Sequence, residues 1–441
     1  MGKAFRLFIW PLAALLLFLS CATSPDAYIK IDEGVRNGSY ENALTSIEKE
    51  TGKARKYIYN KKTDILLYLD RGMVKHYAGL YDESSADLET AEILIEEAFT
   101  KSITEAIGSF LLNDYTKEYP GEDYEDLYIN VFNSLNYYHR NDLEGALVEI
   151  RRLNEKLNYL ADRYERAKKK ATESGNQIDT NQLPIEASRF SNSALARYLG
   201  ILFFRGTGRP DDARIDYEEL QRAYSLAPDV YTHPPPSSLE DELSIPEGMG
   251  RLNIIAFTGL SPIKQEERII VPLLLPPPNH ITSIAIPVMV ARPQTIQRVE
   301  AVLDTGESFP LELLENMGAV AYETFKSRRA LVIFKTVART ITKSVAGAAA
   351  EIAVAKTTDD VGLGVLVGFI GRIFTEISEQ ADTRLSRYFP GEALVGGINL
   401  PPGNYGITVN FYGAGGLIYS EKSKIQVRER GVNLAEFSCL R

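Results

Sequence analysis

The side chains that most often carry out chemistry are few in this chain and far apart along it. Two cysteines, Cys21 and Cys439, cannot form a disulfide-rich scaffold or a four-cysteine zinc site. The sequence contains no GxSxG, HExxH or CxxC motif. No two of the four histidines follow HxH or HxxxH spacing; they are His76, His139, His233 and His280. We therefore expect no metal, no cofactor and no catalytic residues, and we predict that the protein is not an enzyme.

One aspartate lies in a motif that has a catalytic form elsewhere. Residues Ala301–Gly306 (AVLDTG) resemble the core of retroviral-type aspartic proteases, in which two such aspartates share a proton. A single copy would need a homodimer, and here helix-like residues follow Pro310 where that family has further strands. Asp-Thr-Gly is also an ordinary turn after a strand, because Asp caps the turn and Gly accepts a positive φ. We favour the turn for Asp304 and keep the protease as an alternative.

Four carboxylates form the densest acidic cluster of the sequence, between a Tyr-Pro-Gly stretch and an apolar run. A cluster of this kind is usually a solvated surface, and calcium binding is the alternative. The residues are Glu122, Asp123, Glu125 and Asp126.

Length and composition limit the class of protein. A chain of 441 residues suggests two or three domains, and 44% hydrophobic residues are enough for a packed core. The net charge of −10 argues against nucleic-acid binding, because phosphates require a basic face.

The N-terminus has the features of an export signal. Two basic residues precede an apolar run, Phe8–Leu19, which is too short to cross a bilayer but suits a signal peptide. The run ends in FLSC, which resembles a bacterial lipobox with Cys21 as the acylated residue. Acyl chains contribute ~0.8 kcal/mol per buried methylene to anchoring. Ordinary cleavage at the small-x-small sequence Ser20–Ala22 is the alternative. We predict a lipoprotein signal peptide over 1–21 and a polar tether over 22–27.

A four-position pattern recurs in the first half of the chain, over 28–230, where apolar spacings of three and four predict amphipathic helices. Gly or Asn is expected to take the left-handed conformation that ends one helix. Two residues later comes Tyr, Leu or Pro; a small residue then lets the next helix approach, and an apolar residue faces the core. The four instances are Gly38-Tyr40-Ala43-Ile47, Gly79-Tyr81-Ser84-Leu88, Asn141-Leu143-Ala146-Ile150 and Gly208-Pro210-Ala213-Tyr217.

This pattern resembles the tetratricopeptide repeat, most fully between Gly72 and Ala91. Its intervals of 41, 62 and 67 residues depart from a steady repeat, so we expect a compact, irregular helical solenoid. The resemblance implies a concave groove that binds proteins or peptides, with a mere spacer as the alternative. Many tyrosines lie in this half; they suit an interface or a core, and we favour the core for each.

The second half combines strands with a helical insert. A Pro-rich acidic linker over 231–249 precedes a β-rich domain over 250–441, with the insert at about 311–388. We predict a β-sandwich-like domain that ends near a buried, inert thiol at Cys439. The predicted strands are 251–257, 268–274, 283–290, 295–303, 393–399, 403–412, 416–420, 424–428 and 432–437.

The most apolar part of the chain beyond the signal is 361–374 (VGLGVLVGFIGRIF). At this length it cannot span a bilayer, so we favour a buried helix. Its glycine spacing resembles helix-packing motifs, which keeps a membrane-contacting or oligomerising helix as the alternative.

Further stretches carry a resemblance that spans most of the chain: Asn141–Leu153 (NDLEGALVEIRRL), Gly259–Lys264 (GLSPIK), Ala381–Arg384 (ADTR) and Leu400–Gly403 (LPPG). On these residues the chain resembles a family of bacterial lipoproteins with tetratricopeptide-like repeats, whose activity is unassigned. The resemblance implies an anchored interaction protein and brings no catalytic residues with it.

We therefore predict an α+β protein with a TPR-like helical repeat domain followed by the β-rich domain. The expected function is a membrane-anchored periplasmic lipoprotein, at the outer membrane, that acts as an interaction scaffold in cell-envelope assembly. Its expected partners are envelope proteins or peptides at the helical repeats and the membrane at the lipid on Cys21, with no nucleic acid. The alternatives are a regulator or enzyme of peptidoglycan or exported-protein processing, and a structural part of an oligomeric envelope complex.

Overall fold

A computed structural model describes residues 26–54, 57–104, 117–173, 188–273, 280–326, 328–329, 332 and 381–441. The predicted signal peptide, Cys21 and the apolar segment 361–374 lie outside these residues, as does most of the predicted helical insert. Within the described residues, no helix is both long enough and apolar enough to cross a membrane.

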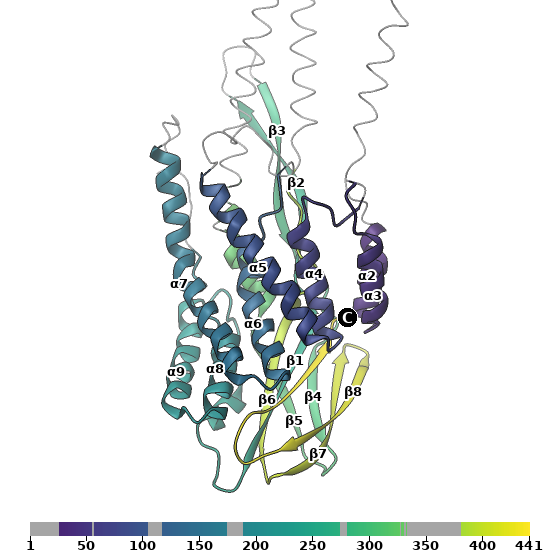
Figure 1. The fold of residues 1–441 in the computed structure, drawn as a ribbon, viewed down its shortest axis with the longest axis vertical. Helices are drawn as coiled ribbons and strands as arrows, with labels where there is room; N and C mark the ends of the chain where they lie inside the picture. Colours follow the sequence, from purple (N-terminus) through teal and green to yellow (C-terminus); the bar gives the residue numbers. More distant parts are fainter. Residues whose placement is uncertain are drawn as a thin grey trace, which may run out of the picture.

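Helical hairpins build the first half, and the residues of the recurrent pattern form their turns (Figure 1). The pairs are α2 (Asp26–Arg36) with α3 (Tyr40–Lys49), α4 (Asp64–Tyr77) with α5 (Tyr81–Thr104), α6 (Asp123–His139) with α7 (Leu143–Glu173), and α8 (Ala194–Gly206) with α9 (Pro210–Leu226). The left-handed conformation predicted for the turn residue is confirmed in every pair, with φ of +71° at Gly38, +75° at Gly79, +60° at Asn141 and +75° at Gly208.

The small residue of the pattern lies where two helices meet. A Cβ added to Gly34 would be 3.0 Å from the Cβ of Ala43, so α2 and α3 are in close contact there. In the second hairpin the hydroxyl of Ser84 donates to the carbonyl of Gly72 at 2.8 Å. Ala146 and Ala213 are buried in the same way. The pattern therefore marks both the turn and the close approach that follows it.

The turn glycines make a quantitative test possible. Gly79 has a positive φ and nothing within 4 Å of an added Cβ, so Gly79→Ala introduces backbone strain without a clash. We expect it to lower the free energy of unfolding by ~1 kcal/mol. Gly415→Ala, in open space without a positive φ, is the matched control and should change it by less than about 0.5 kcal/mol. Urea unfolding measures both; equal effects would contradict the strain account.

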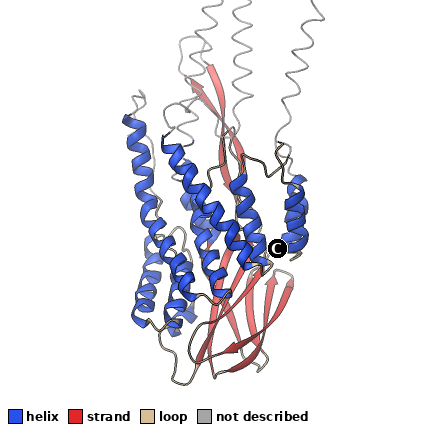
Figure 2. Ribbon diagram, in the orientation of Figure 1, coloured by secondary structure: helices blue, strands red, loops and turns tan. Residues whose placement is uncertain are grey.

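The described residues of the second half form one seven-stranded sheet and a separate two-stranded hairpin, and not the two facing sheets of the predicted sandwich (Figure 2). The sheet order is β8-β7-β4-β5-β6-β1-β9, antiparallel except for β1 with β9. The sheet strands are β1 (Gly250–Leu260), β4 (Arg298–Leu303), β5 (Ser308–Asn316), β6 (Pro390–Leu400), β7 (Gly403–Gly413), β8 (Gly416–Val427) and β9 (Asn433–Cys439); β2 (Ile263–Leu273) and β3 (His280–Val290) form the hairpin.

The two faces of the sheet have different roles. The sheet is nearly closed, since its end strands β8 and β9 approach each other, and the enclosed face buries its own core around Ile254, Val409 and Phe437. The opposite face packs against the helices, where the ring of Phe132 on α6 lies 5.2 Å from that of Phe257 on β1. The larger hydrophobic core is therefore continuous from α2 to β9.

The helices lie in two layers over that sheet face. Helices α4, α6 and α8 form the inner layer, and α6 is buried over almost its whole length. Helices α5, α7 and α9 form the outer layer, where Arg152 on α7 pairs with Glu92 on α5 at 2.5 Å. The inner face of the helical array, which the repeat resemblance assigns to partner binding, thus faces the chain's own sheet (Figure 1).

Two segments differ from the sequence expectation. Strand β5 includes residues 311–316, the start of the expected helical insert; helix begins at residue 317. A β-bulge at Leu314 gives this strand an apolar spacing that resembles a helix. The segment 231–249, expected as a linker, packs against both halves: the carboxylate of Glu242 is fully buried between Arg205 and Arg251.

Candidate functional site

A buried carboxylate joins the inner helices to the sheet. The bulge in β5 directs Glu315 toward the helices, where it accepts hydrogen bonds from the hydroxyls of Tyr128 at 2.7 Å and Tyr231 at 2.6 Å. The hydroxyl of Ser193 and the amide of Leu195, at the start of α8, complete the set. Burial raises the pKa of Glu315, and these donors oppose the rise. The residue holds the two halves together and does not line the cavity at the end of β9.

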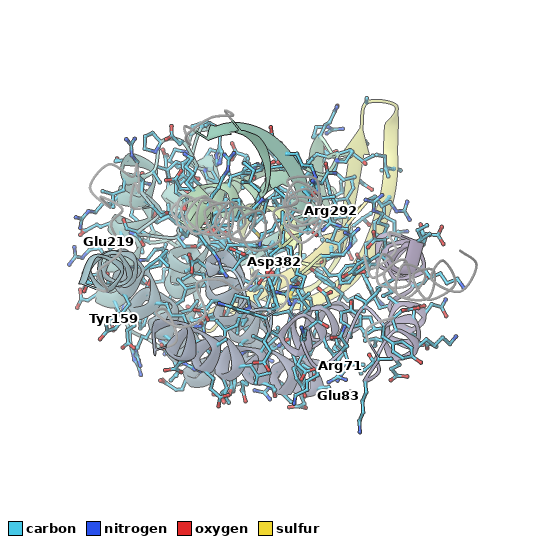
Figure 3. The ribbon with its side chains drawn as sticks, turned by 90° about the horizontal axis from the view of Figure 1, so that it is seen from above. Arg71, Glu83, Tyr159, Glu219, Arg292 and Asp382 are labelled. Atoms are coloured by element: carbon cyan, nitrogen blue, oxygen red, sulfur yellow. The ribbon has the colours of Figure 1, made fainter. Side chains whose placement is uncertain are left out.

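The segment 381–389 has no regular secondary structure and lies between the inner helices and the sheet. Its backbone groups therefore need side-chain partners. The amide of Arg387 and the hydroxyl of Ser386 donate to Asp70 on α4 at 2.9 and 2.7 Å, and burial raises the pKa of Asp70 to about 6. The carbonyl of Tyr388 accepts from the hydroxyl of Tyr77 at 2.9 Å. Arg292 and Asp382 lie within this layer, whereas Tyr159 and Glu219 lie at the periphery (Figure 3).

The acidic cluster is not a solvated surface, so that expectation is wrong. Glu122 pairs with Lys264 at the base of β2 and with Arg328 at 3.4 Å. Glu125 is fully buried: it accepts from the amide of Glu122 at 2.7 Å, as in a capping box, and from Tyr119 and the amide of Ser386. Burial, then the charge of Glu122, raise the pKa of Glu125 to about 7. The cluster starts α6 and holds the 381–389 segment.

Two of the four histidines, distant in sequence, meet on one carboxylate. Nε2 of His76, in the last turn of α4, lies 2.7 Å from Oε1 of Glu436 on β9. Nε2 of His139, in the last turn of α6, lies 2.8 Å from Oε2 of the same residue. Oδ1 of Asn136 accepts a hydrogen bond from Nδ1 of His76 at 2.7 Å, and Tyr81 stacks on His139 with centroids 4.2 Å apart.

The electrostatics of this His–Glu–His bridge favour a negative charge on Glu436 and a positive charge on His76. Burial opposes ionisation of Glu436, but His76 and His139 outweigh it and lower the pKa of the carboxyl. Burial likewise opposes protonation of His76, but Glu436 outweighs it and raises the pKa of the imidazole. The bridge thus pairs charges across the interface between helices and sheet.

A cavity of about 340 Å³ opens beside this bridge. Its walls come from the α2–α3 turn, the end of α4, β8 and the last residues of β9. The lining includes His76 and Glu436, together with Tyr40, Tyr81, Tyr419 and Glu421. This combination of concavity, charge and aromatic rings makes the cavity the candidate functional site.

A cysteine also lines this cavity. Cys439 is a free, buried thiol in its wall, as the sequence predicted, and burial raises its pKa, which disfavours the reactive thiolate. No group of three or more potential metal ligands occurs in the part of the chain that is described. Asp304 is exposed in the β4–β5 turn, where Gly306 has a φ of +103° and the amide of Asp304 donates to Gly406.

The sequence pattern did not reveal this site, although one signal was present. His76 and His139 each lie in the last turn of the first helix of a hairpin, three and two residues before the turn residue. This places both histidines at the same end of the array. Of the residues of the recurrent pattern, Gly38, Tyr40, Gly79 and Tyr81 line the cavity. Those of the third and fourth hairpins do not.

Comparison with known proteins gives no relative. No family model, no curated protein and no solved structure matches the chain.

The bridge predicts a pH-dependent contribution to stability. Because the pKa of His76 is raised in the folded protein, protonated His76 stabilises the fold below its ordinary pKa of 6.5. This stabilisation is lost as the pH rises through the raised pKa. A lowered pKa of Glu436 stabilises it above 4.5, and this is lost as the pH falls. Glu436→Gln should therefore cost about 2 kcal/mol between these two pH values, and less at pH 8.5.

Urea unfolding of the wild-type protein and of Glu436→Gln at pH 5.5 and 8.5 measures the difference. Glu41→Gln, on the exposed side of α3, is the control for a lost carboxylate and should have little effect at any pH. A cost for Glu436→Gln that is equal at pH 5.5 and 8.5 would contradict a charged bridge.

Proposed function

We propose that the chain is a lipid-anchored envelope protein that acts as an interaction scaffold, with its helical hairpins forming a TPR-like platform. The observation that carries this proposal is the two-layered helical array bound to the sheet through one continuous core. Such an array is a rigid body, because moving a helix of the inner layer would expose buried charges and hydroxyls. A rigid body whose outer helices do not pack against the sheet is suited to binding partner proteins.

Partner binding is assigned to the outer layer. The inner face is occupied by β1, β6 and the 381–389 segment, so a peptide cannot use it. Three apolar side chains of the outer layer are about half exposed and could contact a partner. They are Ile93 on α5, Val148 on α7 and Ile215 on α9.

The anchor determines which end of the body faces the membrane. The turn after α2 lies beside the end of β9, so α2 begins at the opposite end of the helical array (Figure 1). With a lipid on Cys21, the tether to Asp26 would be under about 20 Å long. The β2–β3 hairpin would then point to the membrane, and the cavity would face the periplasm.

Affinity capture from detergent-solubilised envelopes tests the scaffold. We expect a set of partners that is lost when Ile93 and Val148 are both replaced by Asp, because charge on this surface opposes apolar contact. The paired replacement of exposed Leu417 on β8 and Leu243 by Asp is the control and should leave the set unchanged. Capture of the same proteins by both variants would contradict binding at the outer layer.

A further inference from the structure

One carboxylate of the cavity has no cationic partner. Glu421 on β8 lines the cavity beside Glu436. Glu436 is bound by two histidines, but in the described part of the chain no lysine, arginine or histidine forms an ion pair with Glu421. Burial, followed by the negative charge of Glu436, raises the pKa of Glu421, and only a hydrogen bond with Tyr419 opposes the rise. A cation beside Glu421 would offset both effects and favour the ionised carboxylate.

Aromatic rings flank this carboxylate. Tyr40 on α3 and Tyr419 on β8 both line the cavity, and the charge of Glu421 contributes to a raised pKa at each hydroxyl after burial. The Tyr419 ring already accepts a cation, since the guanidinium of Arg441 lies 5.1 Å from its centroid. Rings that surround a carboxylate are the usual surroundings of a bound ammonium group.

Two helices end at the cavity, and helix C-termini favour positive charge. Residues 35–38 at the end of α2 and 76–79 at the end of α4 form part of the lining. Nε of Arg441 donates to the carbonyl of Arg36 at 3.3 Å, which is a cation bound by the end of α2.

The positive groups near the cavity do not neutralise Glu421. Arg441 is held by the carbonyls of Arg36 and Ile418. His76 is held by Glu436 and Asn136. Arg36 is exposed at the rim. None of these positive groups forms an ion pair with Glu421 in the described part of the chain, so its carboxylate can accept a further cation.

We propose that this cavity binds an alkylammonium group, with the nitrogen on the carboxylate of Glu421 and the alkyl chain against the rings of Tyr40 and Tyr419. A volume of about 340 Å³ is at the lower end of that of small-ligand pockets, so it suits a side chain or a small amine. The ammonium could be that of a lysine side chain or free amine, or the quaternary group of a headgroup. The inference needs neither the lipid anchor nor the outer helical layer.

Titration calorimetry of the full chain in maltoside micelles tests the site with three probes. Nα-acetyl-lysine N-methylamide and choline carry the charge, and Nα-acetyl-norleucine N-methylamide has the alkyl chain without it. We expect at least one charged probe to bind and the norleucine probe not to bind. Stronger binding of the lysine probe identifies a primary amine, and stronger binding of choline a quaternary one.

Variants locate the binding. Glu421→Gln removes the carboxylate and should lower the affinity for the charged probe at least tenfold. Tyr40→Leu removes one ring and should lower this affinity severalfold. Glu429→Gln, an exposed carboxylate outside the cavity, should leave the affinity unchanged. Equal thermal unfolding midpoints for wild type and Glu421→Gln exclude misfolding as the cause, and Tyr40→Phe, which keeps the ring, should bind as the wild type does. Equal binding of the lysine and norleucine probes, an unaffected Glu421→Gln protein, or no binding of any charged probe at millimolar concentration would overturn the proposal.

Discussion

The polar groups buried between the inner helices and the sheet need partners inside the protein, and this requirement joins the two halves. Leaving one buried donor or acceptor unpaired costs about 1–3 kcal/mol. The tyrosines of the inner helices meet much of this need: Tyr128 donates to Glu315, and Tyr77 to the carbonyl of Tyr388. Tyr138 both donates to the carbonyl and accepts from the amide of Leu434 on β9. Separation of the helices from the sheet would break these bonds together.

The same constraint explains why the two proposed binding surfaces lie where they do. An inner face that is closed by tyrosines and carboxylates leaves the outer layer as the free helical surface. At the end of the inner helices the sheet curves away toward β8, and the cavity forms between α2, α4 and the end of β9. The His–Glu–His bridge marks the limit of the closed interface, since His139 is still partly exposed there.

Local features were predictable from the sequence, and contacts across the chain were not. Gly38 and Asn141 indicate their turns in the sequence, because few other residue types accept the left-handed backbone conformation. Most strands were found from their β-branched residues, but β5 was missed because its bulge at Leu314 breaks the alternation. The pairing of His76 with Glu436 joins residues 360 positions apart, and nothing in the local spacing of either indicates the other.

The acidic cluster is another place where contacts across the chain could not be predicted from the sequence. Four carboxylates in five positions are typical of an exposed helix start, yet Lys264, Arg328 and the 381–389 segment cover Glu122 and Glu125. Only the tertiary fold supplies these partners. Glu315 is a further case, since its local sequence indicates no buried partner, whereas hydrogen bonds from Tyr128, Ser193, Leu195 and Tyr231 hold it in the core.

Native-state hydrogen exchange, followed by mass spectrometry at increasing urea, tests the central claim that helices and sheet form one cooperative unit. If the buried polar interface joins the halves, amides of α6 and of β1 will exchange through a single opening, with the same free energy and the same dependence on urea. If α6 stays protected at urea concentrations where β1 already exchanges, or the reverse, the halves fold separately and the account is contradicted.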